Sequence, residues 1–459
     1  MTTEVGEISN QVTELLEKQR NYFATGATRG WGARKDALNR LERVLVAKRE
    51  EILDALGKDL GKPDVEAYLA EYYFLLQELR MIRKSLKKWL KSRRVSSPFY
   101  FQPCQSVLRR DPYGVGLIVA PWNYPVQLSL SPLIAAVAAG NTVILKPSEI
   151  ASATEQLLVD IITKAFEPEH VAVVTGDAEV SADLLGRQYD FIFFTGSTNV
   201  GRIVARKAAE HMTPNVLELG GKCPCVVDES ANLQVAAQRI LAGKFFNGGQ
   251  TCFAPDFVAV AAERKDKLVA AMREQFQSVP WNKEMAHVVN ERHYKRLKDL
   301  IPEGAEMFGE DMADSLRLAP RLVVNAQWGD AIMEEEIFGP ILPVVTYTNY
   351  DELIESLRSY GSPLALYIFS EDRNMQSRLM RDIRSGGVCI NDTMKQGSNL
   401  SLPFGGVGES GYGRYRGRAG LDAFSYERAV VRRPGWAPDW FEMAPPYGDK
   451  IKWLKQFLR

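Results

Sequence analysis

Cys252 is the side chain of this 459-residue sequence best suited to covalent chemistry. It ends the segment NGGQTC (residues 247–252), which follows an apolar stretch that we predict to be a helix ending near Phe246. Glycines let the backbone approach a ligand closely, and a cysteine near a helix end or turn can have its pKa tuned below the usual value of about 8.5. Taken alone, however, the residue is more readily explained as a small buried hydrophobe.

Glu218 is a second candidate, a carboxylate within LELGGK (residues 217–222). A lone carboxylate between two leucines is hard to explain as packing, and burial would raise its pKa toward neutrality, which suits a general base. An internal ion pair with Lys222 explains the residue equally well. The sequence therefore leaves two interpretations of Glu218 open.

Asn123 is a third candidate, in PWNYP (residues 121–125) directly after a predicted strand. The carboxyl ends of parallel strands carry the ligand site in open α/β sheets. A side-chain amide placed there can donate to a developing oxyanion, which is worth roughly 3–4 kcal/mol of transition-state stabilisation. Capping of the loop by Asn123 is an equally good explanation.

Two further segments at strand ends could hold a nucleotide. In LKPSE (residues 145–149), Lys146 and Glu149 could contact the hydroxyls of an adenosine ribose, although a surface ion pair is the simpler explanation of these residues alone. In TGSTNVG (residues 195–201), a strand turns into a helix, whose exposed N–H groups favour phosphate. Helix capping by Ser197 or Thr198 is compatible with that role.

Other patterns argue against competing chemistries. GVGESG (residues 406–411) matches GxGxxG by letter, but Pro403 and Phe404 precede it in place of a strand, so it fails as a dinucleotide fingerprint. Cys223 and Cys225 are one residue apart without a matching His/Cys cluster, so we predict no metal site. With four histidines and no GxSxG, the sequence gives little support to a serine hydrolase.

We next consider the helices and strands that must position these residues. The first hundred residues are predicted to be helical, with one helix covering residues 63–90. After residue 113, short apolar strands alternate with helices, which predicts doubly wound parallel sheets. Strands are expected at residues 116–120, 142–145, 171–174, 191–195, 257–261, 321–324, 342–347, 365–370 and 387–391. Helices are expected at residues 128–139, 153–166, 180–186, 232–245, 265–277 and 291–299. Residues 220–221, Gly-Gly, form a plausible boundary between two units.

Composition is that of an ordinary globular protein of two or three domains. Lys+Arg and Asp+Glu both number 57, so the formal net charge of zero gives no reason to expect nucleic-acid binding. The basic run over residues 83–94 is predicted to be the solvated face of an amphipathic helix. Five cysteines, an odd number, fit a reducing compartment, and the polar start shows no secretory signal, so we predict a cytoplasmic protein.

Residues 112–145 contain no charged side chain and are long enough to span a bilayer. Pro121, Pro125 and Pro132 interrupt them, so we predict a buried strand, a helix and a second buried strand. We expect no integral membrane segment, and we expect no apolar anchoring tail because the sequence ends at Arg459.

Taken in order, seven segments resemble the aldehyde dehydrogenase superfamily over about residues 20–430. They are PWNYP, LKPSE, FTGST..VG (residues 194–201), LELGGK, GQTC (249–252), EEIFGP (335–340) and LPFGG (402–406). GGQTCFAPD and LPFGGVG are most similar to class 3, the fatty and aromatic aldehyde branch. The resemblance implies an α/β fold with two doubly wound parallel-sheet domains plus a small oligomerisation segment. Residues 1–91 and 111–219 would form the dinucleotide-binding domain, 220–405 the catalytic domain, and 92–110 with 406–459 the oligomerisation segment and tail.

The same resemblance implies an NAD(P)-dependent oxidation of an aldehyde. Cys252 would be the nucleophile, Glu218 the general base and Asn123 the oxyanion donor. The cofactor contacts implied are Lys146 and Glu149 for a ribose, Gly196, Ser197 and Gly201 in the pyrophosphate turn, and Glu336 and Phe338 at the nicotinamide ribose and ring. NAD is the expected cofactor because the Glu149 carboxylate would repel a 2′-phosphate, with NADP as a second acceptable one.

The sequence departs from class 3 where a histidine often follows LPFGGVG, since it reads Tyr-Arg-Gly at residues 415–417 and Phe-Ser-Tyr at 424–426. The loop over residues 393–400 is polar, which leaves substrate choice open. Tyr73, Tyr124 and Phe404 predict an apolar funnel for medium-to-long or aromatic aldehydes.

The alternatives to an acid-forming aldehyde dehydrogenase are a CoA-acylating or acyl-phosphate reductase of the same fold, or a catalytically idle structural protein. The resemblance also implies a homodimer.

Overall fold

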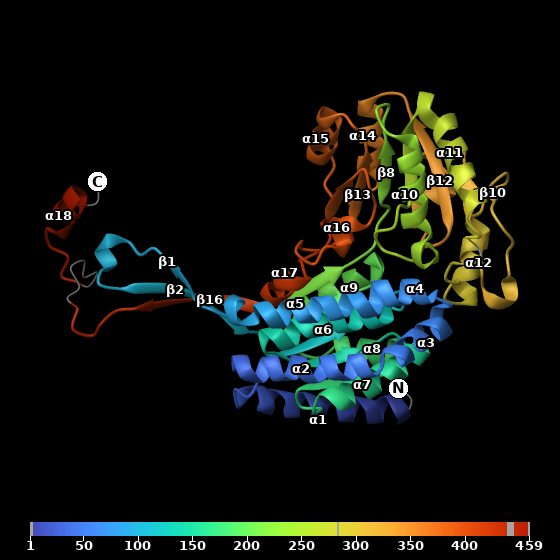
Figure 1. The fold of residues 1–459 in the computed structure, drawn as a ribbon. Coiled ribbons are helices and arrows are strands. Elements are labelled where there is room, and N and C mark those ends of the chain that lie inside the picture. The colour runs from blue at the N-terminus through green and yellow to red at the C-terminus, as the bar shows by residue number, and fades with distance from the viewer. Residues whose placement is uncertain (1–2, 282–283, 438–444, 458–459) are drawn as a thin grey trace.

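The computed structural model describes residues 3–281, 284–437 and 445–457 (Figure 1). The chain begins with a helical layer: α1 (Thr3–Ala24), α2 (Trp31–Ala47), α3 (Arg49–Leu60), α4 (Asp64–Glu66) and α5 (Phe74–Trp89). A π-helical segment, Ala67–Tyr73, joins α4 to α5, so the helix expected over residues 63–90 is present with one wide turn in it. Such π-helical insertions are frequent at functional sites.

A six-stranded sheet lies beside this helical layer. Its strand order is β15 (Gly411–Tyr412), β7 (Asn215–Glu218), β6 (Phe191–Thr195), β3 (Val115–Val119), β4 (Thr142–Lys146) and β5 (Val171–Val173). All neighbours are parallel except β15, which pairs antiparallel with β7. The helices that accompany it are α6 (Pro125–Ala139), α7 (Ser152–Ala165), α8 (Ala178–Leu185) and α9 (Thr198–Glu210).

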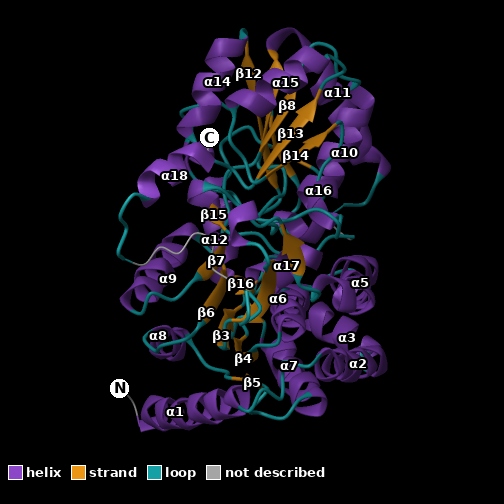
Figure 2. Cartoon of the chain, turned by 90° about the vertical axis from the view of Figure 1, so that its left-hand side faces the viewer, coloured by secondary structure: helices purple, strands orange, loops and turns teal. Residues whose placement is uncertain are grey.

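A second, seven-stranded sheet has helices on both sides (Figure 2). Its order is β10 (Glu306–Met307), β11 (Arg321–Val323), β12 (Ile341–Tyr347), β9 (Phe257–Ala261), β8 (Pro224–Val227), β13 (Ala365–Phe369) and β14 (Gly387–Ile390), and only β10 is antiparallel to its neighbour. Its helices are α10 (Leu233–Phe245), α11 (Lys265–Ser278), α12 (Glu291–Leu300), α13 (Ala331–Glu334), α14 (Tyr350–Ser359), α15 (Arg373–Asp382) and α16 (Lys395–Ser398). The predicted pair of doubly wound parallel sheets is therefore confirmed.

A three-stranded antiparallel sheet projects away from the body of the molecule (Figure 1). It consists of β1 (Arg93–Val95), β2 (Gln105–Pro112) and β16 (Ser425–Arg432), and α17 (Gly417–Ala423) leads into β16. The tail ends in α18 (Lys450–Phe457). Residues 438–444, 458 and 459 of the predicted tail lie outside the described residues.

The uncharged stretch of residues 112–145 forms β3, α6 and β4, as predicted. Every residue of α6 is buried, because this helix lies between the sheet and the helical layer formed by α2 and α5. Within the described part of the chain, no helix is both long enough and apolar enough to cross a bilayer.

Candidate active site

The polar residues predicted at strand ends meet at one edge of the first sheet. β3 pairs in parallel with β6, and β6 with β7, so their carboxyl ends are neighbours. Asn123 follows β3, Thr195 ends β6, and Glu218 ends β7. The short strand β7 has only four residues and was not among the predicted strands, yet Glu218 is its last residue and pairs with Thr195 of β6 and Gly411 of β15.

The loop before Cys252 needs its glycines. Asn247, Gly248 and Gly249 have φ angles of 55°, 62° and 77°, three consecutive left-handed residues, a conformation that glycine adopts without steric cost. A Cβ atom on Gly249 would lie 2.4 Å from the carbonyl oxygen of Gly339. The backbone before the cysteine is thus pressed against residues 335–340, another of the segments singled out in the sequence.

Hydrogen bonds tie the Asn123 loop to the Cys252 loop. Asn123 Nδ2 donates to the Gln250 carbonyl oxygen at 3.0 Å, and Asn247 Nδ2 donates to the Asn123 carbonyl oxygen at 2.9 Å. The hydroxyls of Tyr124 and Thr251 are 2.6 Å apart. Asn123 therefore does brace the loop, and because a primary amide has two N–H donors, a second hydrogen can still serve a ligand.

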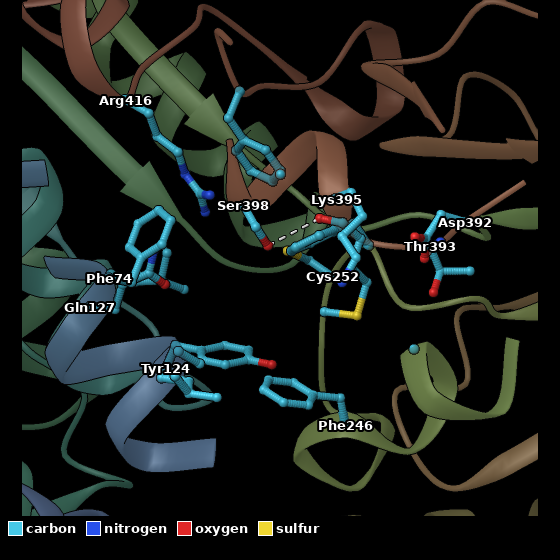
Figure 3. A pocket seen from close by; sticks show the side chains of 18 of the residues that line it. Phe74, Tyr124, Gln127, Phe246, Cys252, Asp392, Thr393, Lys395, Ser398 and Arg416 are labelled. Atoms are coloured by element: carbon cyan, nitrogen blue, oxygen red, sulfur yellow. Dashed lines mark hydrogen bonds between the residues drawn. The ribbon is translucent and has the colours of Figure 1, made fainter. Parts of the chain in front are cut away.

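Two cavities meet at Cys252. One, of about 670 Å³, is lined by Phe74, Tyr124, Phe404 and other mainly apolar residues (Figure 3). The other, of about 850 Å³, is lined by the predicted cofactor residues Gly196, Ser197, Glu336 and Phe338, together with Asn123. Thr195, Glu218 and Cys252 line both. A substrate in one cavity and a cofactor in the other would therefore reach the same sulfur atom.

Glu218 is buried, with 3% of its surface exposed, and neither carboxylate oxygen has a hydrogen-bond partner among the described residues. The alternative ion pair with Lys222 is wrong, because Lys222 Nζ lies 2.7 Å from Asp256 Oδ2 and also donates to two carbonyl oxygens. Burial raises the pKa of Glu218 well above its ordinary value, and the positive charges of Arg416 and Arg414 oppose that rise. These are the properties of a general base held apart from structural ion pairs.

The electrostatics at Cys252 are also dominated by burial. Burial raises the pKa of its thiol, the Glu336 and Glu218 carboxylates raise it further, and Arg416 opposes them. Positive charge beside the sulfur would therefore promote the thiolate, which is the nucleophilic form.

Glu336 and Phe338 lie in the second cavity as the resemblance implies. Burial, and then the neighbouring Asp256, raise the pKa of Glu336 to about 8. A Cβ on Gly220 would lie 2.0 Å from Glu336 Oε2, so this glycine makes room for the carboxylate. The Phe338 ring packs edge-on against Trp122, with ring centroids 5.4 Å apart. Trp122 was not singled out in the sequence as a site residue.

The turn into α9 has the geometry of a capped helix start. Ser197 Oγ accepts a hydrogen bond from the Val200 N–H at 3.4 Å, and the Gly196 N–H donates to the Glu218 carbonyl oxygen at 3.0 Å. Gly201 packs under Leu219, where a Cβ would meet a side-chain carbon at 2.5 Å. Capping and phosphate binding use different N–H groups, so the two predicted roles remain compatible.

Lys146 and Glu149 form an ion pair at 3.3 Å, but the pair is not a surface one. The Lys146 side chain is 1% exposed and also donates to the Pro147 carbonyl oxygen at 2.5 Å, whereas Glu149 is 42% exposed. Neither residue is among the described residues that line the two cavities at Cys252. Both follow β4, which is adjacent to β3 in the sheet.

The predicted apolar funnel needs one correction. Tyr124 and Phe404 line the first cavity, but Tyr73 does not and is 43% exposed, because the π-helical turn directs its neighbour Phe74 inward instead. The polar loop over residues 393–400 supplies Thr393, Lys395 and Ser398 to the cavity wall (Figure 3). Arg416, noted in the sequence only as a departure from class 3, also lines it.

Comparison with known proteins identifies the family that this site belongs to. The model of the aldehyde dehydrogenase family matches residues 5–430 of this chain. The chain belongs to the aldehyde dehydrogenase family. The predicted family and fold are thereby confirmed, and so is the prediction of an enzyme.

Similar members of this family share about two fifths of their residues with this aldehyde dehydrogenase. The chain is 40% identical to 4,4'-diaponeurosporen-aldehyde dehydrogenase of Staphylococcus aureus, over 98% of this chain and 100% of that one, and 39% identical to aldehyde dehydrogenase family 3 member B1 of Rattus norvegicus, over 95% of each. A solved structure of the substrate-bound state of Staphylococcus aureus AldH superposes with a TM-score of 0.95 at 38% identity, covering 98% and 99%. An NAD-dependent aldehyde dehydrogenase from Sinorhizobium meliloti superposes with a TM-score of 0.84 at 27% identity, covering 94% and 89%.

Proposed function

We propose that this protein oxidises an apolar aldehyde, of medium or long chain or with an aromatic ring, to the carboxylic acid with NAD as hydride acceptor. The observation that carries the proposal is the junction of two cavities at Cys252, with Glu218 at the same junction and Asn123 beside it. An idle structural protein has no need for this junction. The family's NAD-dependent member from Sinorhizobium meliloti supports the cofactor.

In this mechanism, the Cys252 thiolate attacks the aldehyde carbonyl, and the Asn123 amide and the Cys252 backbone N–H hold the resulting oxyanion. NAD held in the second cavity would supply the hydride acceptor for this adduct, so that the oxidised product on Cys252 would be a thioester. Glu218 then takes a proton from water, the water oxygen bonds to the thioester carbon, and the carbon–sulfur bond breaks to release the acid. A buried base at this place argues against a CoA-acylating or acyl-phosphate reductase, which has no use for water activation.

For the cofactor, we propose that the second cavity holds the nicotinamide half. Gly196 and Ser197 at the start of α9 suit the pyrophosphate, with Gly201 allowing close helix packing. Glu336 and Phe338 suit the nicotinamide ribose and ring, and Lys146 and Glu149 the adenosine ribose. Four of these seven residues line the cavity, which is the support for this assignment.

The first cavity supports the proposed substrate class, because its wall includes Leu69, Phe74, Tyr124, Phe246 and Phe404. The Staphylococcus aureus relative is named as a dehydrogenase of 4,4'-diaponeurosporen-aldehyde, so an aldehyde substrate is printed for that protein. An alkyl chain in such a cavity gains about 0.8 kcal/mol for each buried CH₂.

A series of linear aldehydes from propanal to dodecanal tests the proposal. With NAD, kcat/KM is expected to rise with chain length by up to about fourfold per CH₂, as 0.8 kcal/mol implies, and the carboxylic acid should form without added CoA or phosphate. NADH absorbance and chromatography of the acid measure both. A requirement for CoA or phosphate, or a kcat/KM that is flat along the series, would contradict the proposal.

Cofactor preference tests the role of Glu149. We expect NAD to be preferred over NADP, because each pair of like unit charges 4 Å apart costs about 1 kcal/mol in water, roughly fivefold. Glu149→Gln should narrow the preference, and Glu179→Gln, at an exposed helix start on the same sheet domain, should not. The measurement is kcat/KM for both cofactors with one aldehyde, and a strong NADP preference of the unmodified protein would refute the argument.

The homodimer remains a prediction. Its support is the projecting sheet, whose outer strands β1 and β16 each leave one edge unpaired among the described strands. Unpaired strand edges readily pair with another chain.

A further inference from the structure

Arg416 is a buried cation on the substrate side of the junction that the mechanism above does not use. Only 5% of it is exposed, and it lines the first cavity together with Cys252 and Glu218. Its guanidinium lies 4.8 Å from the ring centroid of Phe74 and 4.3 Å from that of Phe404. Figure 3 shows Arg416 and Cys252 pointing into the same space. A cation is costly to bury without a specific purpose.

The backbone at Arg416 has an unfavourable conformation, which a hydrogen bond from the next residue to helix α5 holds in place. Its φ angle of 77° is in the left-handed region, which is rare for residues other than glycine and clusters at functional sites. The next residue, Gly417, donates its N–H to Glu78 Oε1 at 2.8 Å, and the fully buried Glu78 also accepts from Ser131. Helix α5 thus fixes the direction in which Arg416 points.

Several buried polar atoms around this cavity have no hydrogen-bond partner among the described residues. They are Arg416 Nε, both carboxylate oxygens of Glu218, Thr195 Oγ1 and Tyr415 Oη. The ion pairs of the described residues do not include one between Arg416 and Glu218, although the positive charge of Arg416 opposes the rise in the pKa of Glu218. Buried donors and acceptors that protein groups leave unpaired are usually satisfied by water.

We propose that Arg416 positions the hydrolytic water for Glu218. The inference rests on the proposed function. A guanidinium can only donate hydrogen bonds, so a water that accepts one from Arg416 Nε must direct its hydrogens elsewhere, and Glu218 offers two free acceptors. The remaining lone pair of the water can attack the thioester carbon. The proton goes to Glu218, the C–O bond forms, and the C–S bond breaks with its electron pair on the Cys252 sulfur.

The charges around Glu218 are few, so the contribution of Arg416 can be separated. The titratable and charged groups that face it are Arg414, Tyr415 and Arg416 after β15, and Cys252 on the opposite loop. The Arg414 guanidinium is held by the carbonyl oxygens of Gly406 and Gly413. Removing the Arg416 charge should therefore raise the pKa of Glu218, and the ionised base would form only at higher pH.

The test compares Arg416→Gln, Arg416→Lys and Arg416→Met with Arg418→Gln, a control whose side chain is two residues away and 59% exposed. The substrates are decanal and NAD. For Arg416→Gln we expect a burst of one NADH per site followed by slow turnover. The ascending limb of kcat against pH should also shift upward by about one pH unit, so that kcat falls about tenfold at pH values below the limb. Arg416→Lys should reverse most of this shift, because it keeps a positive charge, and Arg418→Gln should change neither the burst nor the pH limb. Methionine keeps the packing on the two rings if glutamine does not fold.

The inference would be overturned if Arg416→Gln melts like the unmodified protein, loses burst rate and steady-state rate equally, and keeps its pH limb in place. Arg416 would then have only a packing role. Glu218→Gln is measured in parallel. If Glu218→Gln turns over normally, the proposed function itself fails. If Glu218→Gln is slow while the Arg416 variants behave like the unmodified protein, only the inference about Arg416 fails.

Discussion

Cys252→Ala is expected to abolish aldehyde oxidation while leaving the protein folded. The alanine cannot form the covalent adduct, so the loss in kcat should be on the order of 10⁶, the scale on which a covalent nucleophile contributes. The side chain is only partly buried and Cys252 is surrounded by cavity, so the smaller residue should cost little stability. NADH formation from decanal and a thermal melt measure the two effects.

Cys389→Ala is the matched control, since this thiol is also partly buried but lies on β14 and lines neither cavity at Cys252 among the described residues. It should keep full activity. Alkylation by iodoacetamide should block the unmodified protein and Cys389→Ala alike. Oxidation of the aldehyde by folded Cys252→Ala would show that another group is the nucleophile.

Glu218→Gln is expected to separate the two halves of the reaction. Acylation should continue, because Cys252 and Asn123 are untouched, whereas loss of a general base should slow hydrolysis by about 10²–10⁴-fold. One NADH per site should then form rapidly, and the thioester should accumulate as an acyl adduct visible by mass spectrometry. Glu179→Gln, on the exposed start of α8, should show neither effect.

The pH dependence gives the same assignment a second readout. Because burial raises the pKa of Glu218 well above its ordinary value, the base is ionised only toward higher pH, and deacylation should weaken as the pH falls through that pKa. Glu218→Gln should lose this ascending limb. A folded glutamine variant that forms acid at an unchanged steady-state rate would show that Glu218 is not the base.

Sequence patterns predicted an element correctly where the residues of one segment alone define it. The predicted strands 191–195 and 257–261 coincide with β6 and β9, because continuous apolar runs between turn residues read as buried strands. The strands β7 and β8, of four residues each, were not predicted, since so short a pattern does not stand out from its surroundings. Apolar periodicity likewise does not reveal the π-helical turn, because of which Phe74 and not Tyr73 faces the cavity.

The sequence by itself determined the chemical groups: a cysteine after glycines, a carboxylate before Gly-Gly and an amide after a strand. The tertiary structure decided what these groups do to one another. It paired Lys222 with Asp256 and so left Glu218 unpaired, it brought the ends of β3, β6 and β7 together beside Cys252, and it placed Arg416 across a cavity from them. Partner choice depends on contacts between residues far apart in the chain, and local spacing carries no information about those distances.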